Sequence, residues 1–199
     1  MIKRFFDLVM SLLGLLLLSP VFLIIAVFIL LDSRGGVFYK QMRVGRGGMD
    51  FNLFKFRSMK THSDLKGALT IGANDSRITR VGFYIRKYKL DELPQLLNVF
   101  IGNMSLVGPR PEVRKYVQLY NKEQLEVLTV KPGITDYASI VFSNESELLG
   151  KNDDPEKVYI DQIMPQKLRL NLKYIREKGM IKDIRIILGT LSKITGLGR

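Results

Sequence analysis

The chain has 199 residues and a formal net charge of +12, from 31 Lys and Arg against 19 Asp and Glu, which predicts an anionic partner such as nucleic acid, anionic lipid or a phosphorylated substrate. Its length suits one ordinary domain, and 46% hydrophobic residues exclude both a disordered chain and a polytopic membrane protein. The absence of cysteine excludes disulfides and thiolate metal sites, and a single histidine, His62, argues against multi-histidine centres and Ser-His-Asp triads.

A long apolar run opens the chain. Residues 8–31 contain no charged side chain, and Lys3, Arg4 and Asp7 precede them. The run is too long for a signal peptide, and no small-residue cleavage site follows it. As a helix rising about 1.5 Å per residue it would reach about 36 Å, and a bilayer core is about 30 Å thick. Length alone therefore favours a membrane-spanning helix.

Ser19 and Pro20 interrupt this run near its middle. Proline removes a backbone hydrogen bond, the Ser19 hydroxyl can supply a substitute, and a break there would let the chain leave by the face it entered. Basic residues flank both ends, which suits a re-entrant hairpin because positive charge marks the cytoplasmic side. Helices kinked by proline also span membranes, so the residues alone leave both topologies open.

The next segments predict strands and a loop. Residues 37–59 contain two stretches with extended character, separated by a turn at Gly45, Gly47 and Gly48. Residues 60–75 are polar and turn-rich, which is typical of a loop, and His62 is expected to be solvated there rather than catalytic.

An acidic pair follows the most basic stretch of the chain. Residues 77–90 hold several Lys and Arg and no acid, and Asp91 and Glu92 come directly afterwards. Pro94 predicts a helix N-terminus at or just before Asp91, since proline is tolerated in a first turn. The structural explanation is that Asp91 caps this helix and Glu92 favours its dipole. The functional one is that carboxylates beside cations can hold a phosphate, a divalent cation and a nucleophile together.

Arg110 lies between two prolines, Pro109 and Pro111, directly after Gly108. This pattern is typical of an ordinary loop, but it also predicts a stiff turn that aims one guanidinium. A rigidly held Arg suits bidentate recognition of phosphate.

The C-terminal half is predicted to be helical. Residues 112–130 fit an amphipathic helix, and further helices are predicted over residues 156–177 and 181–194. The last combines Lys and Arg with Ile and Leu, which suits either core packing or a membrane surface.

These motifs resemble the bacterial sugar transferases, the monotopic phosphoglycosyl transferases that start lipid-linked glycan assembly. The stretches that carry the resemblance lie within residues 2–140 and read KRFFDL, LLSP, GGVFYKQMRVG, FKFRSM, RITRVGFYIRKYKLDELPQLLNV, GNMSLVGPRPE and KPGIT. The resemblance implies an α+β, predominantly helical fold. A re-entrant membrane helix over residues 1–35 would break at Ser19 and Pro20, and a compact cytoplasmic catalytic domain with interfacial amphipathic helices would cover residues 36–199.

The resemblance also implies a reaction. Asp91 would attack the sugar-bearing phosphorus of a UDP-sugar, release UMP and form a phosphosugar-aspartyl intermediate, which polyprenyl (undecaprenyl) phosphate then attacks. Glu92 would hold the Mg²⁺ cofactor against the diphosphate. Lys55, Arg86 and Arg110 match basic family positions and are candidates for binding the substrate phosphates.

The expected partners are a UDP-sugar, polyprenyl phosphate and the bilayer of the bacterial inner (cytoplasmic) membrane, with the catalytic domain facing the cytoplasm. Nucleic acid is not expected, and a homodimer is left open. Residues 136–155 depart from the family pattern, so the donor sugar is not assigned. Two alternatives stay open: a membrane-anchored phosphohydrolase with the same dyad, and a basic module that binds anionic lipid or nucleic acid.

Overall fold

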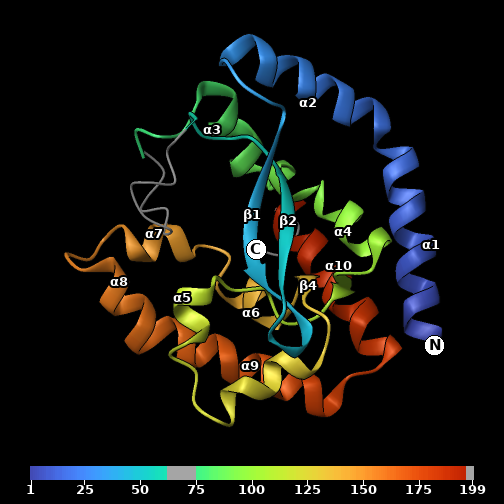
Figure 1. The fold of residues 1–199 in the computed structure, drawn as a ribbon, viewed down its shortest axis with the longest axis vertical. Helices are drawn as coiled ribbons and strands as arrows, with labels where there is room; N and C mark the ends of the chain where they lie inside the picture. Colours follow the sequence, from blue (N-terminus) through green and yellow to red (C-terminus); the bar gives the residue numbers. More distant parts are fainter. Residues whose placement is uncertain (62–74, 196–199) are drawn as a thin grey trace.

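The computed structural model describes residues 1–61 and 75–195, where the chain is mostly helical and contains two small sheets (Figure 1). The helices are α1 Ile2–Leu17, α2 Ser19–Asp32, α3 Arg80–Lys87, α4 Gln95–Ile101, α5 Arg114–Val117, α6 Tyr137–Val141, α7 Glu145–Leu149, α8 Pro155–Val158, α9 Met164–Glu177 and α10 Met180–Thr195. The strands are β1 Phe38–Val44, β2 Asp50–Phe56, β3 Ser105–Val107 and β4 Gly133–Thr135. The predicted α+β, predominantly helical fold is confirmed, and the prediction for His62 lies outside the described residues.

Shorter helical turns connect these elements: the 3-10 turns η1 Arg46–Gly48, η3 Leu90–Glu92 and η4 Gln124–Thr129, and the π-helical turn η5 Tyr159–Ile163. The turn η5 joins α8 to α9, so residues 155–177 are helical throughout and the helix predicted over residues 156–177 is confirmed. The helix predicted over residues 181–194 is confirmed as α10.

The apolar run folds as two helices, α1 and α2, that meet at Leu18 with a bend of 59°. Pro20 has no N–H to donate to the carbonyl of Leu16, and the Ser19 hydroxyl donates to that carbonyl instead, at 2.8 Å. Within the described residues, no single helix is long and apolar enough to cross a bilayer, and only this bent pair satisfies the criterion jointly. The break therefore falls where Ser19 and Pro20 predict it.

The polar side chains of α1 face the rest of the protein, and its apolar ones face outward. Asp7 is 2% exposed and accepts hydrogen bonds from the Ser105 hydroxyl at 2.8 Å and from the N–H of Leu106 at 3.1 Å. Two basic side chains near the start of α1, Arg4 and Lys3, extend these contacts to the end of α4 and to α10, respectively. The outer face is exposed and hydrophobic, as at Leu17, which is 77% exposed.

The predicted pair of extended segments forms an antiparallel hairpin, in which Phe38 lies opposite Phe56 and Val44 opposite Asp50. Its turn runs through η1, where Gly47 has a φ of 70° that favours glycine. The inner side of β2 packs Phe56 against α2 and α3, and this cluster connects the apolar run to the hairpin.

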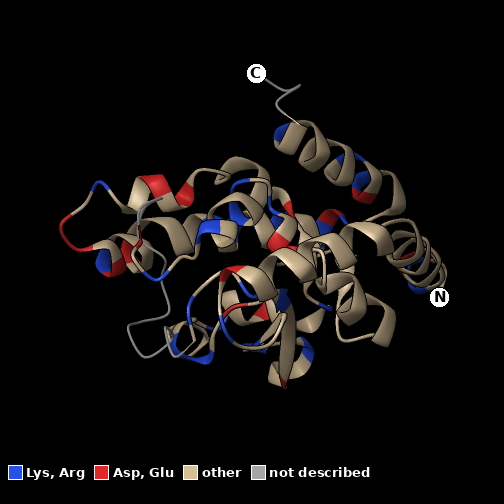
Figure 2. Cartoon of the chain, turned by 90° about the horizontal axis from the view of Figure 1, so that it is seen from above, with Lys and Arg blue, Asp and Glu red and all other residues tan. Residues whose placement is uncertain are grey.

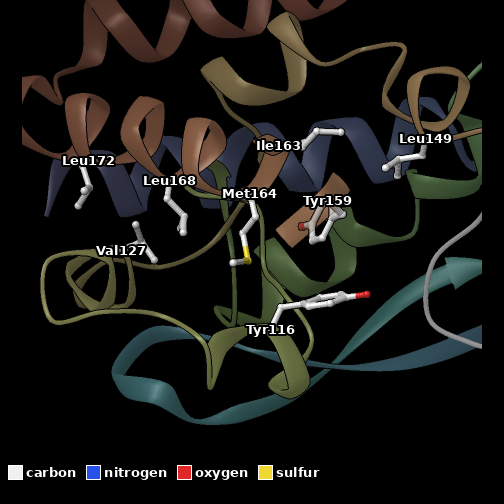
Figure 3. Packing of buried hydrophobic residues seen from close by; sticks show 8 residues of the cluster. All are labelled: Tyr116, Val127, Leu149, Tyr159, Ile163, Met164, Leu168 and Leu172. Atoms are coloured by element: carbon white, nitrogen blue, oxygen red, sulfur yellow. The ribbon is translucent and has the colours of Figure 1, made fainter. Parts of the chain in front are cut away.

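The helix predicted over residues 112–130 is wrong, because the structure has only the short helix α5 and the turn η4 in this region. Asn121 and Gln124 each accept a hydrogen bond from the other's backbone N–H, both at 2.9 Å. Such local side-chain contacts start a new turn and compete with a continuous helix. The two short elements instead cover α9, and Tyr116 and Val127 pack against Met164 and Leu168 (Figure 3).

Asp91 is not a helix cap, contrary to the structural explanation given for it above. The residues around it form η3, and α4 begins at Gln95, four residues after Asp91, without a side-chain cap. Pro94 lies in the turn that connects η3 to α4, so helical geometry does begin next to Asp91. The carboxylate of Asp91 is therefore not used to satisfy the backbone of α4.

Replacing Asp7 with Ala is expected to lower the free energy of unfolding by about 1–3 kcal/mol, because it leaves the buried Ser105 hydroxyl and Leu106 N–H without their acceptor. Chemical denaturation in detergent micelles measures this change. Asp50→Ala is the matched control, since the one ion pair that Asp50 forms with the described residues is an exposed pair with Arg114. Equal stability of the Asp7 and Asp50 variants would contradict the prediction.

Candidate active site

Asp91 and Glu92 lie in the short turn η3, between α3 and α4. The turn closes through hydrogen bonds from the N–H of Glu92 to the carbonyl of Lys89 at 3.3 Å and from the N–H of Leu93 to that of Leu90 at 3.2 Å. Adjacent residues in a tight turn point their side chains in different directions, so the two carboxylates meet different surroundings. The two carboxylates indeed differ in their hydrogen-bond partners.

Glu92 is bound by two cations. Its carboxylate accepts two hydrogen bonds from the guanidinium of Arg110, one of them at 3.1 Å, and one from the ammonium of Lys55 at 3.4 Å. Burial alone would raise the pKa of Glu92, but the charges of Arg110 and Lys55 outweigh it and hold this pKa well below its usual range. Glu92 is therefore ionised and fixes two cations beside the turn.

The same cluster shifts its cations in opposite directions. Burial lowers the pKa of Lys55, although Glu92 and Asp91 oppose the shift. The charge of Glu92 raises the pKa of Arg110. Arg110 thus keeps a permanent charge, as guanidinium groups do in proteins.

Asp91 has no such partners. It is 5% exposed, and across residues 1–61 and 75–195 no group forms a hydrogen bond or ion pair with its carboxylate. Burial raises the pKa of Asp91 above its usual range, against the attraction of the nearby Lys55. A carboxylate that is buried, unpaired and adjacent to cations is suited to attack an electrophile bound by those cations.

The structure brings two of the three predicted phosphate-binding residues into contact with the dyad. Lys55 reaches Glu92 from β2, and Arg110 reaches it from the loop after β3. Arg86 lies on α3, half-buried, and its charge acts on Asp91 without a direct hydrogen bond between the described side chains. Arg86 therefore lies close enough to act on the dyad through its charge, but it does not form an ion pair with either carboxylate.

The loop that carries Arg110 is held by a close backbone contact. Strands β3 and β4 pair in parallel, with Ser105 opposite Gly133, and the N–H of Gly133 donates to the carbonyl of Pro109 at 3.0 Å. A Cβ added to Gly133 would lie 2.1 Å from the backbone nitrogen of Gly108, so only glycine allows this approach. The predicted stiff turn thus depends on the glycine of the Lys-Pro-Gly segment as well as on the prolines.

Asp136 was missed as a site residue. It is fully buried, accepts a hydrogen bond from the backbone N–H of Arg110 at 3.1 Å, and caps α6 through the N–H of Ser139 at 2.6 Å. Asp before a short helix is a recognisable capping signal in the sequence. No nearby residue indicates that its second carboxylate oxygen accepts a hydrogen bond from the backbone of Arg110.

Asn98 was also missed, although it aligns the dyad with Lys55. Its side chain accepts from the N–H of Phe54 at 2.9 Å and donates to the carbonyl of Asn52 at 2.7 Å. The side-chain amide of Asn98 on α4 therefore fixes β2 relative to the turn that precedes α4. Lys55 is the residue after Phe54 on this strand. Only the place of Asn98 on the buried face of α4 could have drawn attention to it.

The carboxylates fit a magnesium ion that is shared with a substrate. Among the residues that the structure describes, no three His, Cys, Asp or Glu side chains come together as a metal site. A carboxylate offers about four lone-pair sites, and Arg110 and Lys55 occupy three on Glu92. Magnesium is typically held by one or two carboxylates together with substrate phosphates and water. The dyad can supply such ligands, whereas the described residues do not form a metal centre by themselves.

The charged residues around this site are mixed rather than segregated. Figure 2 shows Asp and Glu interspersed with Lys and Arg through the body of the protein. Part of the basic charge is therefore paired locally, as between Arg43 and Glu112 at 3.0 Å, and the net charge of +12 is what remains for other partners.

The chain belongs to the bacterial sugar transferase family, whose family model matches residues 1–196. It is 40% identical to the UDP-glucose:undecaprenyl-phosphate glucose-1-phosphate transferase of Escherichia coli (strain K12), over 97% of this chain and 40% of that protein. It is 37% identical to the UDP-N-acetylgalactosamine-undecaprenyl-phosphate N-acetylgalactosaminephosphotransferase of Aeromonas hydrophila, over 99% of this chain and 44% of that protein. The family resemblance expected from the motifs is confirmed.

The chain spans less than half the length of these two relatives. A third relative is of similar size: the exopolysaccharide production protein PSS of Rhizobium leguminosarum bv. phaseoli is 38% identical, over 96% of this chain and 93% of that protein.

The depressed pKa of Glu92 makes stability depend on pH. Its ionised form contributes stability above the pKa of an unfolded Glu, about 4.3, and this contribution is lost as the pH falls through the lower folded pKa. Glu92→Gln is therefore expected to lower the free energy of unfolding by about 1–3 kcal/mol at pH 7, with a smaller difference at pH 3. Urea titrations at both pH values measure it.

The control is Glu126→Gln, which replaces an exposed carboxylate that forms no ion pair with the described residues. It is expected to change stability little at either pH. A loss in Glu92→Gln that is equally large at pH 7 and pH 3 would contradict the assigned charge state.

Proposed function

We propose that this chain transfers a sugar 1-phosphate from a UDP-sugar to polyprenyl phosphate and releases UMP. The observation that carries the proposal is the contrast within the dyad, where Asp91 is buried and unpaired while Glu92 is bound by Lys55 and Arg110. Family membership supports the same reaction, and two relatives bear the names of undecaprenyl-phosphate sugar phosphotransferases.

In the first half-reaction, a carboxylate oxygen of Asp91 attacks the phosphorus that bears the sugar. The bond from this phosphorus to the oxygen bridging the two phosphates breaks, and UMP leaves with the electron pair. Asp91 then carries the sugar phosphate as a mixed anhydride. The lack of competing hydrogen bonds on Asp91 within the described structure supports its role as the nucleophile.

In the second half-reaction, a phosphate oxygen of the polyprenyl phosphate attacks the phosphorus on Asp91. The carboxylate of Asp91 is the leaving group, so the enzyme is restored and a diphosphate-linked lipid is formed. The buried position of Asp91 excludes bulk water, and this exclusion favours transfer to the lipid over hydrolysis.

The basic residues would bind the phosphates. Lys55 and Arg110 are held next to Asp91 by their shared partner Glu92, and both can contact the diphosphate of the donor. Arg86 adds positive charge from α3. Magnesium held by Glu92 together with the donor would neutralise negative charge on the departing UMP.

We infer that α1 and α2 form a re-entrant membrane anchor over residues 1–35, with residues 36–199 as a cytoplasmic domain at the bacterial inner membrane. The contacts of α1 support this topology. Lys3 forms an ion pair with Asp183 on α10, and Arg4 donates to the carbonyl of Val99 at 2.6 Å. The start of the anchor thus contacts the same body that follows its end, whereas a spanning helix would separate the two by a bilayer.

The reaction is tested by incubating the full chain with Mg²⁺, undecaprenyl phosphate and either UDP-glucose or UDP-N-acetylgalactosamine, and measuring UMP. Without the lipid we expect one stoichiometric burst, and EDTA is expected to abolish it. Mass spectrometry should find one added sugar phosphate on the unmodified chain and none on Asp91→Asn, because an amide cannot form the anhydride.

Two results would contradict this assignment. Steady UMP release without lipid would indicate a phosphohydrolase, and a sugar phosphate retained on Asp91→Asn would exclude Asp91 as the nucleophile. Asp75→Asn is the control, because it replaces a carboxylate that is paired with Arg77 and lies outside the dyad. This variant should still gain one sugar phosphate.

The topology is tested with single cysteines at positions 2 and 40, because the chain has none of its own. In intact cells both are expected to resist a membrane-impermeant thiol reagent, and both should react once the inner membrane is opened. Labelling of position 2 alone from the periplasm would contradict the hairpin.

A further inference from the structure

Lys89 connects α3 to the turn η3, and its backbone conformation is unusual. Across residues 1–61 and 75–195 it is the only residue other than glycine with a positive φ, of 57°. This left-handed conformation is disfavoured for residues that have a side chain, and glycine or asparagine usually takes it after a helix. The presence of lysine here therefore calls for an explanation in terms of its side chain.

The backbone contacts of Lys89 do not require that side chain. Its N–H donates to the carbonyl of Arg86 at 3.0 Å, and its carbonyl accepts from the N–H of Glu92 at 3.3 Å. Glycine would make both hydrogen bonds and would adopt the conformation without strain. The ammonium group is thus the feature that distinguishes lysine from the residue that the backbone favours.

Lys89 is exposed and lies two residues before Asp91. No carboxylate in the described part of the chain lies within ion-pair distance of it, in contrast to Lys55, which is bound to Glu92. Its charge nevertheless favours the ionised forms of both Asp91 and Glu92. Lys89 therefore offers an uncommitted cation beside the proposed nucleophile.

The helix that leads to Lys89 adjoins the apolar run. Asp32, the last residue of α2, accepts a hydrogen bond from the N–H of Val81 in the first turn of α3 at 2.9 Å, and the two helices lie close together in Figure 1. The exposed aromatic side chains next to Lys89 on this segment are Phe83, Tyr84 and Tyr88. Tyrosine rings such as Tyr84 and Tyr88 are typical of the level at which lipid headgroups meet water.

We propose that the ammonium of Lys89 binds the phosphate of the polyprenyl phosphate acceptor. This inference rests on the proposed function and assigns to it a residue that acts in the second half-reaction. Lys55 and Arg110 come from β2 and from the loop after β3, whereas Lys89 comes from the segment next to the anchor. The ammonium of a lysine is a compact charge on a flexible side chain. From the segment next to the anchor, it can contact the terminal phosphate of a lipid.

The test uses the full chain in phosphatidylcholine vesicles with Mg²⁺, undecaprenyl phosphate and the UDP-sugar that it turns over. The rate of the UMP burst before lipid is added reports the donor half-reaction, and the steady-state rate against undecaprenyl phosphate gives the KM for the acceptor. Lys89→Gly is expected to raise that KM about 10-fold or more, because a charge-assisted contact is lost.

Lys89→Gly also separates the effect of losing the charge from the effect of changing the backbone conformation. Its thermal midpoint should be no lower than that of the unmodified chain, since glycine relieves the left-handed conformation. Lys89→Arg is expected to recover part of the acceptor affinity. Lys87→Ala is the matched control, because Lys87 is also exposed, has helical backbone and lies over the ring of Tyr88; its KM for the acceptor should be unchanged.

Two results would overturn the inference. The first is an unchanged acceptor KM in Lys89→Gly, which together with a slower UMP burst would assign Lys89 to the donor. The second is an equal rise in Lys87→Ala, which would indicate general attraction to the lipid surface. Failure of the unmodified chain to release UMP from any donor would instead overturn the proposed function and this inference with it.

Discussion

The ion cluster of Glu92 with Arg110 and Lys55 is the interaction on which the arrangement of the site depends. It joins three segments that are far apart in the sequence: the turn before α4, the strand β2 and the loop after β3. The three side chains are partly buried, so an unpaired carboxylate or an unpaired cation here would be costly, and the ion cluster favours the three segments in this arrangement together. Asp91 stays outside the cluster, so its position is fixed without its charge being neutralised.

The rest of the fold holds these three segments at the right distance. Asn98 attaches β2 to α4, Asp136 holds the backbone of Arg110, and Gly133 allows β4 to approach the same loop. Asp7 adds the first helix to this frame through β3. The proposed membrane anchor and the proposed phosphate site thus share one strand, and the height of the site above a bilayer would follow from the docking of α1.

The features that local sequence patterns predicted are those with local causes. The hairpin follows from alternation around glycines, the bend follows from Ser19 and Pro20, and the dyad stands out because it interrupts a basic stretch. The failures have two causes. The helix expected over residues 112–130 is broken by a local contact between Asn121 and Gln124 that the apolar periodicity does not reveal, whereas the residues that were missed act on backbone groups distant in the sequence. Asp136, for instance, binds a backbone N–H that lies 26 residues before it.

The hydrogen bond from Ser19 to the carbonyl of Leu16 has a consequence for the lipids themselves. A proline bend normally leaves a carbonyl that must find water or a neighbouring protein, but here Ser19 supplies the donor for that carbonyl from within the bend. The carbonyl of Leu16 then needs neither water nor a second protein. If α1 and α2 insert as a hairpin, they add volume to one leaflet and none to the other. Each copy would then act as a wedge, and many copies together would favour a bilayer that is convex on the side of the protein.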